Sequence, residues 1–221
     1  MNKGLFISIE GTDGCGKTSV IKEIKRHFSD NKNVVYTREP GGHNNKISEK
    51  IRELVLNNEM DFMTEALLFA ASRSENVSKF ILPNLENNKI VISDRYFDSS
   101  LVYQGIARNI GIENIYDMNV LATKNLIPIK TFVLSVEPKI SKARIESSRI
   151  KLPPSRRVSN DEMNRFDVEQ PELQKKVFDG YLHLSKMYPE RIILIDASRD
   201  FKIVCTDLIK KIEELIKEHG L

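Results

Sequence analysis

A glycine-rich segment near the start of the chain constrains the fold more than any other feature. Residues 11–18 read Gly-Thr-Asp-Gly-Cys-Gly-Lys-Thr and match the pattern GxxxxGK[ST]. The apolar run Leu5–Glu10 precedes this segment, and the amphipathic stretch Lys17–Ser29 follows it. A strand, a glycine-rich turn and a helix N-terminus in this order present backbone N–H groups and a positive helix dipole to an anion. The segment therefore predicts a phosphate-binding loop in an α/β fold.

The residue types of the loop indicate a nucleoside triphosphate as its ligand. Lys17 supplies a positive charge to the outer phosphates, and the hydroxyl of Thr18 is suited to binding Mg²⁺. Cys15 is expected to be a small residue whose backbone N–H matters and whose thiol does not. The residues expected to bind ATP here are Gly11, Thr12, Asp13, Gly14, Cys15, Gly16, Lys17, Thr18 and Ser19.

Short apolar runs alternate with amphipathic stretches along the rest of the chain. Strands are expected at Val34–Tyr36, Ile90–Ser93, Lys130–Val136 and Arg191–Ile195, and helices at Asn45–Asn57, Thr64–Asn87 (with a break near Pro83) and Phe201–Glu218. The alternation favours parallel strands joined by right-handed crossovers, with ligands beyond the carboxyl ends of the strands. Polar clusters at 11–18, 38–42, 94–96 and 196–198 each follow a strand, so we expect them to form one site.

Composition excludes several other classes of protein. The chain has 221 residues, 40% of them hydrophobic, which fits one folded α/β domain with a single core, or at most two small domains. With 34 basic and 31 acidic residues the net charge is only +3, so nucleic-acid binding by bulk electrostatics is not expected. No apolar run approaches the roughly 18 residues of a membrane span. The two cysteines lie outside any CxxC spacing and the four histidines are scattered, which favours a reduced, cytoplasmic protein without a zinc site.

Arginines outside the loop predict a second anionic ligand. Arg38, Arg52, Arg73 and Arg95 all lie at strand ends or on helix faces that can meet the same crevice. Because a guanidinium group binds phosphate with two parallel hydrogen bonds, this recurrence suits a ligand that carries its own phosphate. Arg52 taken alone is also compatible with a solvated helix face.

Two pairs of residues spaced four apart indicate recognition of a base. Phe69 and Arg73 share one helix face, which suits a ring that is both stacked and hydrogen-bonded, although Phe69 in the core and Arg73 at its rim is the simpler alternative. Ser100 and Gln104 offer a hydroxyl and an amide, and an amide pairs with a pyrimidine edge. Asp94, directly after a strand, is expected to hold Mg²⁺ through water or to contact the loop threonine.

Five motifs in this order make the chain similar to the thymidylate kinases of the bacterial kind, over nearly its whole length. The motifs are Glu10–Thr18, Thr37–Gly42, Leu68–Arg73, Asp94–Tyr96 and Tyr103–Gly105. The resemblance implies a three-layer P-loop NTPase fold of the nucleoside monophosphate kinase type, with a five-stranded parallel sheet flanked by helices and a lid. It also implies a homodimer that transfers the γ-phosphoryl group of ATP to dTMP with Mg²⁺, giving dTDP for dTTP biosynthesis.

The resemblance also implies roles for individual residues. For dTMP, it implies stacking on Phe69, base-edge contacts with Arg73 and Gln104, phosphate contacts with Arg38, Arg52 and Arg95, and a pocket completed by Asp13, Glu39, Ser100 and Tyr103. Ala197 is expected near the adenine of ATP, and Thr18 and Asp94 at the metal. The expected catalytic residues are Lys17, Asp13, Glu39, Arg95 and Arg149.

The polar, basic segment at 147–166 is expected to be the lid. Some members of the family carry a catalytic arginine directly after the loop acid, where this chain has Gly14, and others carry it in the lid. Arg149 is the residue expected to supply that charge, with Arg144 beside it at the ATP, while Arg156 and Arg157 in mid-segment are alternatives.

Two other functions fit parts of the sequence. A deoxynucleoside kinase also uses a phosphate-binding loop, but its uncharged acceptor would leave Arg38, Arg52 and Arg73 without a phosphate. A nucleotide-dependent switch is less compatible with the sequence, because the string Thr123-Lys124-Asn125-Leu126 lacks the aspartate of a guanine-reading motif.

Overall fold

Five parallel strands form the centre of the molecule. The computed structural model describes residues 4–42, 44–151 and 171–221, with the backbone alone for 148–151 and 171. The strands are β1 (Leu5–Gly11), β2 (Val34–Arg38), β3 (Ile90–Asp94), β4 (Lys130–Ser135) and β5 (Ile192–Asp196), in the sheet order β2-β3-β1-β4-β5. β1 lies in the middle, with Ile7 level with Ile92 of β3 and Ile9 level with Phe132 of β4. All five strands expected from the sequence are confirmed, with ends shifted by at most two residues.

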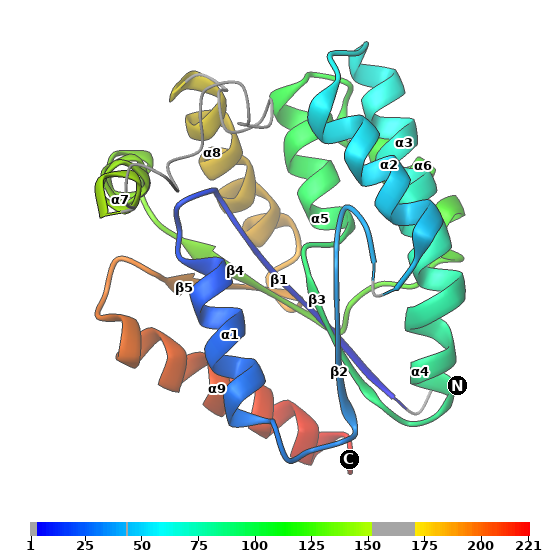
Figure 1. The fold of residues 1–221 in the computed structure, drawn as a ribbon, viewed down its shortest axis with the longest axis vertical. Coiled ribbons are helices and arrows are strands. Elements are labelled where there is room, and N and C mark those ends of the chain that lie inside the picture. Colours follow the sequence, from blue (N-terminus) through cyan, green and yellow to red (C-terminus); the bar gives the residue numbers. More distant parts are fainter. Residues whose placement is uncertain (1–3, 43, 152–170) are drawn as a thin grey trace.

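Two hydrophobic cores, one on each face of the sheet, make the molecule a three-layer structure. All seven residues of β1 are buried, and its side chains alternate between Leu5, Ile7 and Ile9 on one face and Phe6 on the other. The first face packs against α1 (Lys17–His27) and α9 (Phe201–Glu218), whose apolar stripes point inward. These two helices, blue and red in Figure 1, lie together on one side of the strands.

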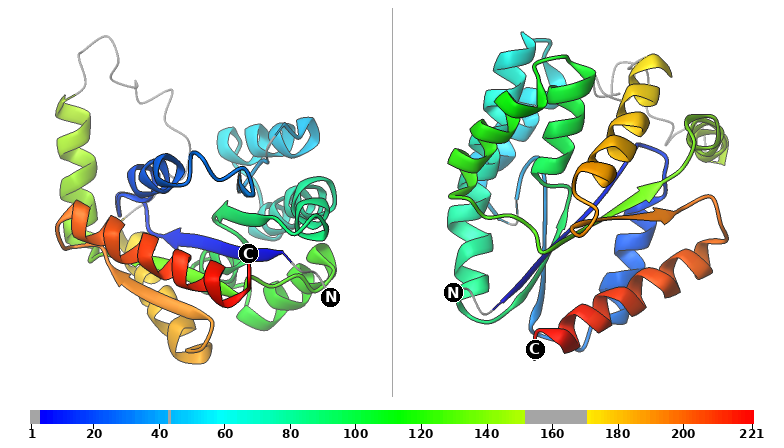
Figure 2. Two further views of the ribbon diagram at one scale, coloured as in Figure 1. Left: turned by 90° about the horizontal axis from the view of Figure 1, so that it is seen from below. Right: turned by 180° about the vertical axis from the view of Figure 1, so that it is seen from behind.

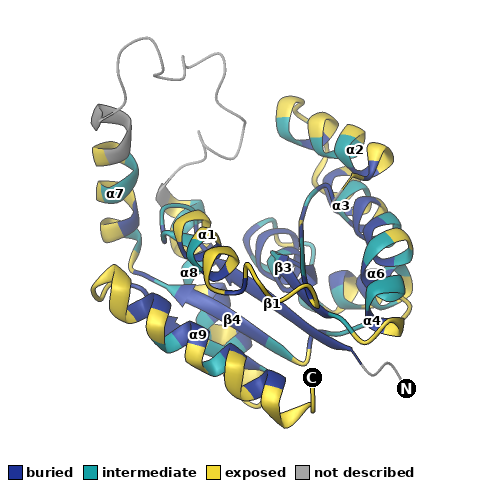
Figure 3. Cartoon of the chain, turned by 60° about the horizontal axis from the view of Figure 1, so that its bottom comes forward, coloured by how far each residue is buried: buried dark blue, intermediate teal, exposed yellow. Residues whose placement is uncertain are grey.

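Helices from the middle of the chain cover the second face, as Figure 2 shows in the view from behind. They are α3 (Phe62–Asn76), α4 (Leu82–Glu86), α5 (Phe97–Ser100), α6 (Ile112–Thr123) and α8 (Pro171–Met187), together with two π-helical segments, η1 (Val77–Ile81) and η2 (Leu101–Ala107). α2 (Lys46–Asn57) packs on α3 at the edge of this layer, and α7 (Pro138–Lys151) follows β4. Figure 3 shows that the inner strands β1, β3 and β4 are mainly buried and that the helices expose their outer faces. The edge strands β2 and β5 are partly exposed.

The helix break expected near Pro83 is not present, because the chain stays helical from Phe62 to Glu86. A proline lacks the N–H of a helix and its ring clashes with the carbonyl one turn earlier. Here the turn before Pro83 is π-helical, and the N–H of Leu82 donates to the carbonyl of Val77, five residues back. The wider turn accommodates the proline without ending the helix.

The expected lid segment at 147–166 begins inside a helix. α7 continues through Ser147 to Lys151, and residues 152–166 lie outside the described part of the chain. Residues 147–151 are therefore helical rather than part of a flap.

The carboxyl ends of β1, β2 and β3 meet at one edge of the sheet. Arg38 at the end of β2 is level with Asp94 at the end of β3, and the backbone N–H of Arg95 donates to Ile9 of β1 over 2.9 Å. Arg95 has a φ of 68°, a left-handed conformation that is unfavourable for a residue with a side chain. Such backbone conformations concentrate at functional sites, where surrounding contacts enforce them.

Candidate active site

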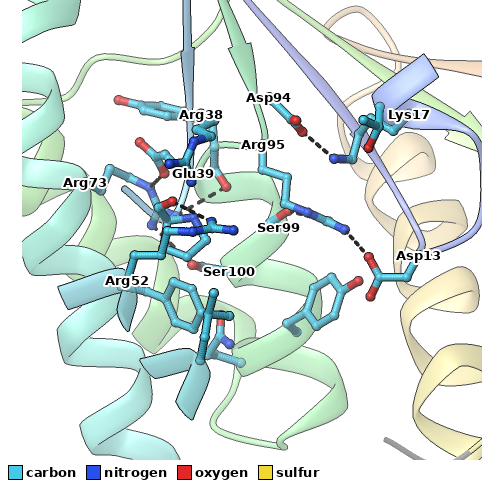
Figure 4. Close-up of a pocket in the computed structure, with 17 residues that line it drawn as sticks. Asp13, Lys17, Arg38, Glu39, Arg52, Arg73, Asp94, Arg95, Ser99 and Ser100 are labelled. Atoms are coloured by element: carbon cyan, nitrogen blue, oxygen red, sulfur yellow. Dashed lines mark hydrogen bonds and ion pairs between the residues drawn. The ribbon is translucent and has the colours of Figure 1, made fainter. Parts of the chain in front are cut away.

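A cavity of about 270 Å³ opens at this edge of the sheet. Seventeen residues line it: Asp13, Lys17, Thr18, Arg38, Glu39, Pro40, Arg52, Leu56, Phe69, Arg73, Asp94, Arg95, Tyr96, Ser99, Ser100, Tyr103 and Gln104. The structure thus brings together all ten residues expected to bind the acceptor, as well as both expected metal ligands. In Figure 4, Arg38, Arg52 and Arg73 lie on one side, Lys17 and Asp13 lie on the other, and Arg95 lies between them.

The phosphate-binding loop forms as the glycine spacing requires. Gly14 and Gly16 have φ values of 76° and 92°, and α1 begins directly after them at Lys17. The ammonium group of Lys17 forms an ion pair with the carboxylate of Asp94 at the end of β3. This pair joins the loop to the neighbouring strand, and it places the lysine and the candidate metal ligand at the same point of the cavity.

The other residues expected to bind ATP lie around the loop, mostly outside the cavity. Burial raises the pKa of the Cys15 thiol, which fits the expectation that this thiol is unreactive. Arg144 of α7 donates to the carbonyl oxygen of Cys15 over 3.4 Å, so it contacts the loop itself. Ser19 is exposed on α1, whereas Ala197 is 4% exposed and packs in the core beyond β5. The side chain of Arg149 lies outside the described residues.

Arg95 is fixed between the loop and α5. Its Nη2 donates to Asp13 Oδ1 over 2.8 Å, and its Nη1 donates to Ser99 Oγ over 3.1 Å. The guanidinium carbon lies 5.3 Å from the ring centre of Tyr103, within the range of a cation–π contact. The hydroxyl of Tyr103 is buried without a hydrogen-bond partner among the described residues, so it remains available to a ligand.

Glu10, which was not assigned to the site from the sequence, lies beneath the cavity and binds residues that surround Arg95. Its fully buried carboxyl group accepts hydrogen bonds from Tyr96 N (2.7 Å), Ser99 Oγ (2.5 Å) and Tyr181 OH (3.0 Å). Burial raises its pKa from 4.5 to about 7, although Arg95 opposes the shift. The position of Glu10 at the end of an apolar strand could have indicated from the sequence that it belongs to the site.

Arg73 is more deeply buried than either sequence interpretation expected. It is 2% exposed, and its Nε lies 2.6 Å from Oε2 of Glu39. Its Nη1 donates to Ser100 and Asn119, and its Nη2 donates to the carbonyl of Tyr96 over 3.4 Å. A guanidinium group has five N–H donors, so one on Nη2 has no partner among the described residues. The rim alternative is wrong, because Arg73 is in the interior while Phe69 is only half-buried.

Glu39 is occupied by this network. Asn76 Nδ2 donates to its Oε1 over 3.4 Å, while Arg73 holds the other oxygen. Burial raises the pKa of the Glu39 carboxyl above its usual value, and Arg73 partly opposes the shift. In this structure the Glu39 carboxylate therefore serves to hold the guanidinium group of Arg73.

The two remaining arginines approach from β2 and α2. Arg38 donates to Glu49 Oε2 over 2.9 Å and is half-exposed, whereas Arg52 Nη1 donates to the carbonyl of Pro40 over 2.9 Å. Burial lowers the pKa of Arg52, and the nearby positive charge of Arg38 lowers it further. Because the positive charge of Arg52 is disfavoured in this way, an anion bound beside it would stabilise the site.

The oxygens of Thr18 and Asp94 fit Mg²⁺. This ion keeps several waters and takes only one or two protein ligands where substrate phosphates supply the rest. A hydroxyl and a carboxylate on the same cavity match that donor set. Within residues 4–42, 44–151 and 171–221, no cluster of three or more His, Cys, Asp or Glu residues is placed to hold a metal ion.

Four lining residues were not assigned to the site from the sequence: Pro40, Leu56, Tyr96 and Ser99. Leu56 lies four residues after Arg52, on the same face of α2, so the helical spacing could have predicted that it lines the cavity. The other three lie within motifs that were recognised, but their side chains were given no role.

The sequence and the fold both resemble known proteins. Residues 9–208 match the family model for thymidylate kinase. A thymidylate kinase from Ligilactobacillus salivarius is 43% identical over 212 residues, which cover 94% of this chain and 96% of the relative. One from Clostridium novyi is 42% identical over 204 residues, covering 90% and 93%. The crystal structure of thymidylate kinase from Ehrlichia chaffeensis superposes with a TM-score of 0.72 at 30% identity, covering 95% of this chain and 98% of that one.

No described helix has both the length and the apolar character required to cross a bilayer.

Proposed function

Because the chain belongs to the thymidylate kinase family, we propose that it transfers the γ-phosphoryl group of ATP to dTMP, forming dTDP and ADP on the route to dTTP. The fold is that of the P-loop nucleoside monophosphate kinases. The observation that carries the proposal is the charge of the cavity. Five cationic side chains line it against three carboxylates, and they converge from both sides. Such a surplus suits two phosphorylated ligands that meet end to end.

The reaction requires charge neutralisation more than proton transfer. An oxygen of the dTMP phosphate attacks the γ-phosphorus, and the bond from that phosphorus to the β–γ bridging oxygen breaks, leaving ADP. Both reactants are anionic, so their repulsion dominates the barrier. In this proposal Lys17 binds the transferred group and Arg95 contacts both phosphates, and the position of Arg95 between the two halves of the cavity supports its role. Asp13 holds Arg95 in that position over 2.8 Å.

The acceptor half of the cavity suits a thymine nucleotide. Arg38 and Arg52 offer a dianion site, and half-buried Phe69 offers a ring face for stacking. Arg73 retains one N–H donor for a base carbonyl, and Gln104 lines the same cavity. Ser100 and Tyr103 complete the wall beside the sugar.

Thr18 and Asp94 are the residues proposed to hold Mg²⁺. When bound, the ion would offset the charge of the ATP phosphates. Asp94 would then exchange its Lys17 partner for the metal, so Lys17 would be released to bind the phosphates.

The donor half of the site is proposed to include the loop residues Gly11–Ser19, with Arg144 and Ala197. Arg144 already contacts the loop, which supports its assignment. Arg149, in the proposed lid at 147–166, would add charge at the γ-phosphoryl group. We also propose that residues 1–221 form one domain, which is supported by β4 and β5 joining the same sheet as β1, β2 and β3.

The chain is further proposed to be a cytoplasmic homodimer. Its two cysteines, Cys15 and Cys205, are free and buried, which suits a reducing compartment. Leu67 on α3 and Leu121 on α6 are 53% and 84% exposed, and these two helices pack against each other. Exposed leucines on adjacent helices favour that layer as the subunit contact.

A measurement of ADP formation with different acceptors tests the proposal. We expect ADP release that requires both dTMP and Mg²⁺, and none above background with thymidine in place of dTMP. Turnover of thymidine would instead support a deoxynucleoside kinase. Equal ADP release without any acceptor would contradict both enzymes and would favour a nucleotide-dependent switch.

A further inference from the structure

A buried carboxylate behind the cavity fixes the direction of the Gln104 amide. Glu65 of α3 is fully buried, and its Oε1 accepts a hydrogen bond from Nε2 of Gln104 over 2.6 Å. Glu65 does not line the cavity, whereas Gln104 does. Glu65 therefore reaches the cavity through the glutamine.

The chemistry of the two side chains permits one arrangement. A carboxylate accepts hydrogen bonds and donates none, so the NH₂ end of the amide must face it. Nη2 of Arg108 lies 3.6 Å from the other oxygen, Oε2, and stabilises the charge of Glu65. The Oε1 atom of Gln104 makes no hydrogen bond with any described residue. It is left as an acceptor at the surface of the cavity.

An acceptor at this place distinguishes between pyrimidines. Thymine presents a donor at N3, whereas cytosine presents an acceptor there. A carbonyl oxygen therefore pairs with N3–H of thymine and repels N3 of cytosine. An unrestrained glutamine could turn its amide over and offer an N–H to cytosine, because its two ends are nearly the same in shape. An amide that is held in one orientation therefore prefers thymine over cytosine.

We propose that Glu65 is a positioning residue for base selection, which holds Gln104 as a hydrogen-bond acceptor and so excludes cytosine nucleotides. The position of Glu65 on α3 supports this role. Glu65, Phe69 and Arg73 follow one another at intervals of four residues, so one helix face carries the restraint, the stacking ring and the guanidinium group. The inference rests on the proposed function, since it presumes a thymine acceptor.

The test compares the binding of dTMP and dCMP by calorimetry without ATP, so that it does not depend on turnover. In the Glu65→Gln variant either amide can turn, and we expect the preference for dTMP over dCMP to fall roughly tenfold, the size of one lost base contact. An unchanged preference in a folded variant would overturn the proposal. Equal weakening for both nucleotides would also overturn it, because this result would indicate a purely structural role.

Two further variants separate positioning from folding. In a Gln104→Ala background, Glu65→Gln should leave the preference unchanged, because Glu65 acts only through Gln104. A further loss in that background would contradict the mechanism. If Glu65→Gln alone does not fold because it removes the carboxylate that faces Arg108, the combined variant Glu65→Gln with Arg108→Gln removes both charges and should show the same tenfold loss. Wild-type protein that binds neither nucleotide would instead count against the proposed function itself.

Discussion

The ammonium group of Lys17 in the phosphate-binding loop pairs with the carboxylate of Asp94 at the end of β3. Each side chain is thus neutralised by the other at the point where a phosphate and a metal ion are expected. The pair is part-buried, with 12% and 26% of the two side chains exposed. An ion pair of this kind contributes little to stability but keeps both groups in place. Loss of Lys17 should therefore affect turnover much more than stability.

Replacement of Lys17 tests this expectation. We expect Lys17→Ala to lower kcat by about 100-fold or more, because a preorganised charge at the transferred group is lost. The free energy of unfolding should change by about 1 kcal/mol or less. Lys22→Ala, an exposed lysine on the same helix, is the matched control and should leave kcat unchanged. A large loss of stability in Lys17→Ala would instead assign the lysine a structural role.

The same substitution should cost much more stability at Arg73 than at Arg38. Arg73→Ala leaves Glu39 buried without its partner, so we expect a loss of about 3–5 kcal/mol in urea denaturation. Arg38→Ala removes only a half-exposed pair with Glu49 and should cost about 1 kcal/mol or less, while it raises KM for dTMP. Similar stabilities for the two variants would contradict the buried network.

The Arg38–Arg52 pair predicts that an anion stabilises the folded protein. Burial and the charge of Arg38 both lower the pKa of Arg52, so a bound dianion relieves an unfavourable arrangement. In thermal denaturation, dTMP should therefore raise Tm more than thymidine does at the same concentration. Arg52→Met should remove most of that difference. If Arg52→Met retains the full difference, the phosphate binds elsewhere.

Glu10 predicts a defined pH dependence of stability. Its pKa is about 7 in the folded protein, against 4.5 for an unperturbed glutamate, because burial and the charge of Asp98 outweigh Arg95. Between these two values the unfolded chain has lost the proton while the folded protein keeps it. The free energy of unfolding therefore falls as pH rises through this window, by roughly 3 kcal/mol, and the penalty is constant above it.

The variant Glu10→Gln isolates this contribution, because its side chain does not titrate. We expect its stability relative to wild type to rise between pH 5 and about pH 7.5. Unfolding in urea at several pH values measures the difference. A difference that stays constant with pH would show that the Glu10 carboxyl does not titrate in this window.

Much of the cavity follows from the sequence because parallel strands impose it. The clusters at Gly11–Thr18, Arg38–Gly42 and Asp94–Tyr96 each follow a strand, and the carboxyl ends of parallel strands share an edge. The three clusters could therefore be predicted to lie together without knowledge of any contact between residues distant in the sequence. The helical spacing of Phe69 and Arg73 likewise placed both on one face of α3.

The partners of those residues were not predictable in the same way. Asn119, which accepts a hydrogen bond from Arg73, lies in α6, and this helix was not predicted. Buried Asn119 and Thr123 interrupt its apolar stripe, so its periodicity is weak. Tyr181 reaches Glu10 from α8, which was also missed although Val177, Tyr181 and Leu184 are spaced as a helix stripe. Tertiary pairing decides such contacts, and no local pattern encodes it.

The proposed dimer makes the final prediction, which concerns the outer face of α3 and α6. Leu67 and Leu121 are 53% and 84% exposed, and covering them in a subunit contact would remove apolar surface from water. An aspartate at either position would carry an unpaired charge into the contact. We therefore expect Leu67→Asp and Leu121→Asp to shift the mass measured by light scattering from dimer to monomer. Ile203→Asp on α9, which is 51% exposed on the opposite side of the sheet, is the control and should remain dimeric. Dissociation of the Ile203 variant with the leucine variants intact would place the contact at α9 instead, and a monomeric wild type would refute the dimer.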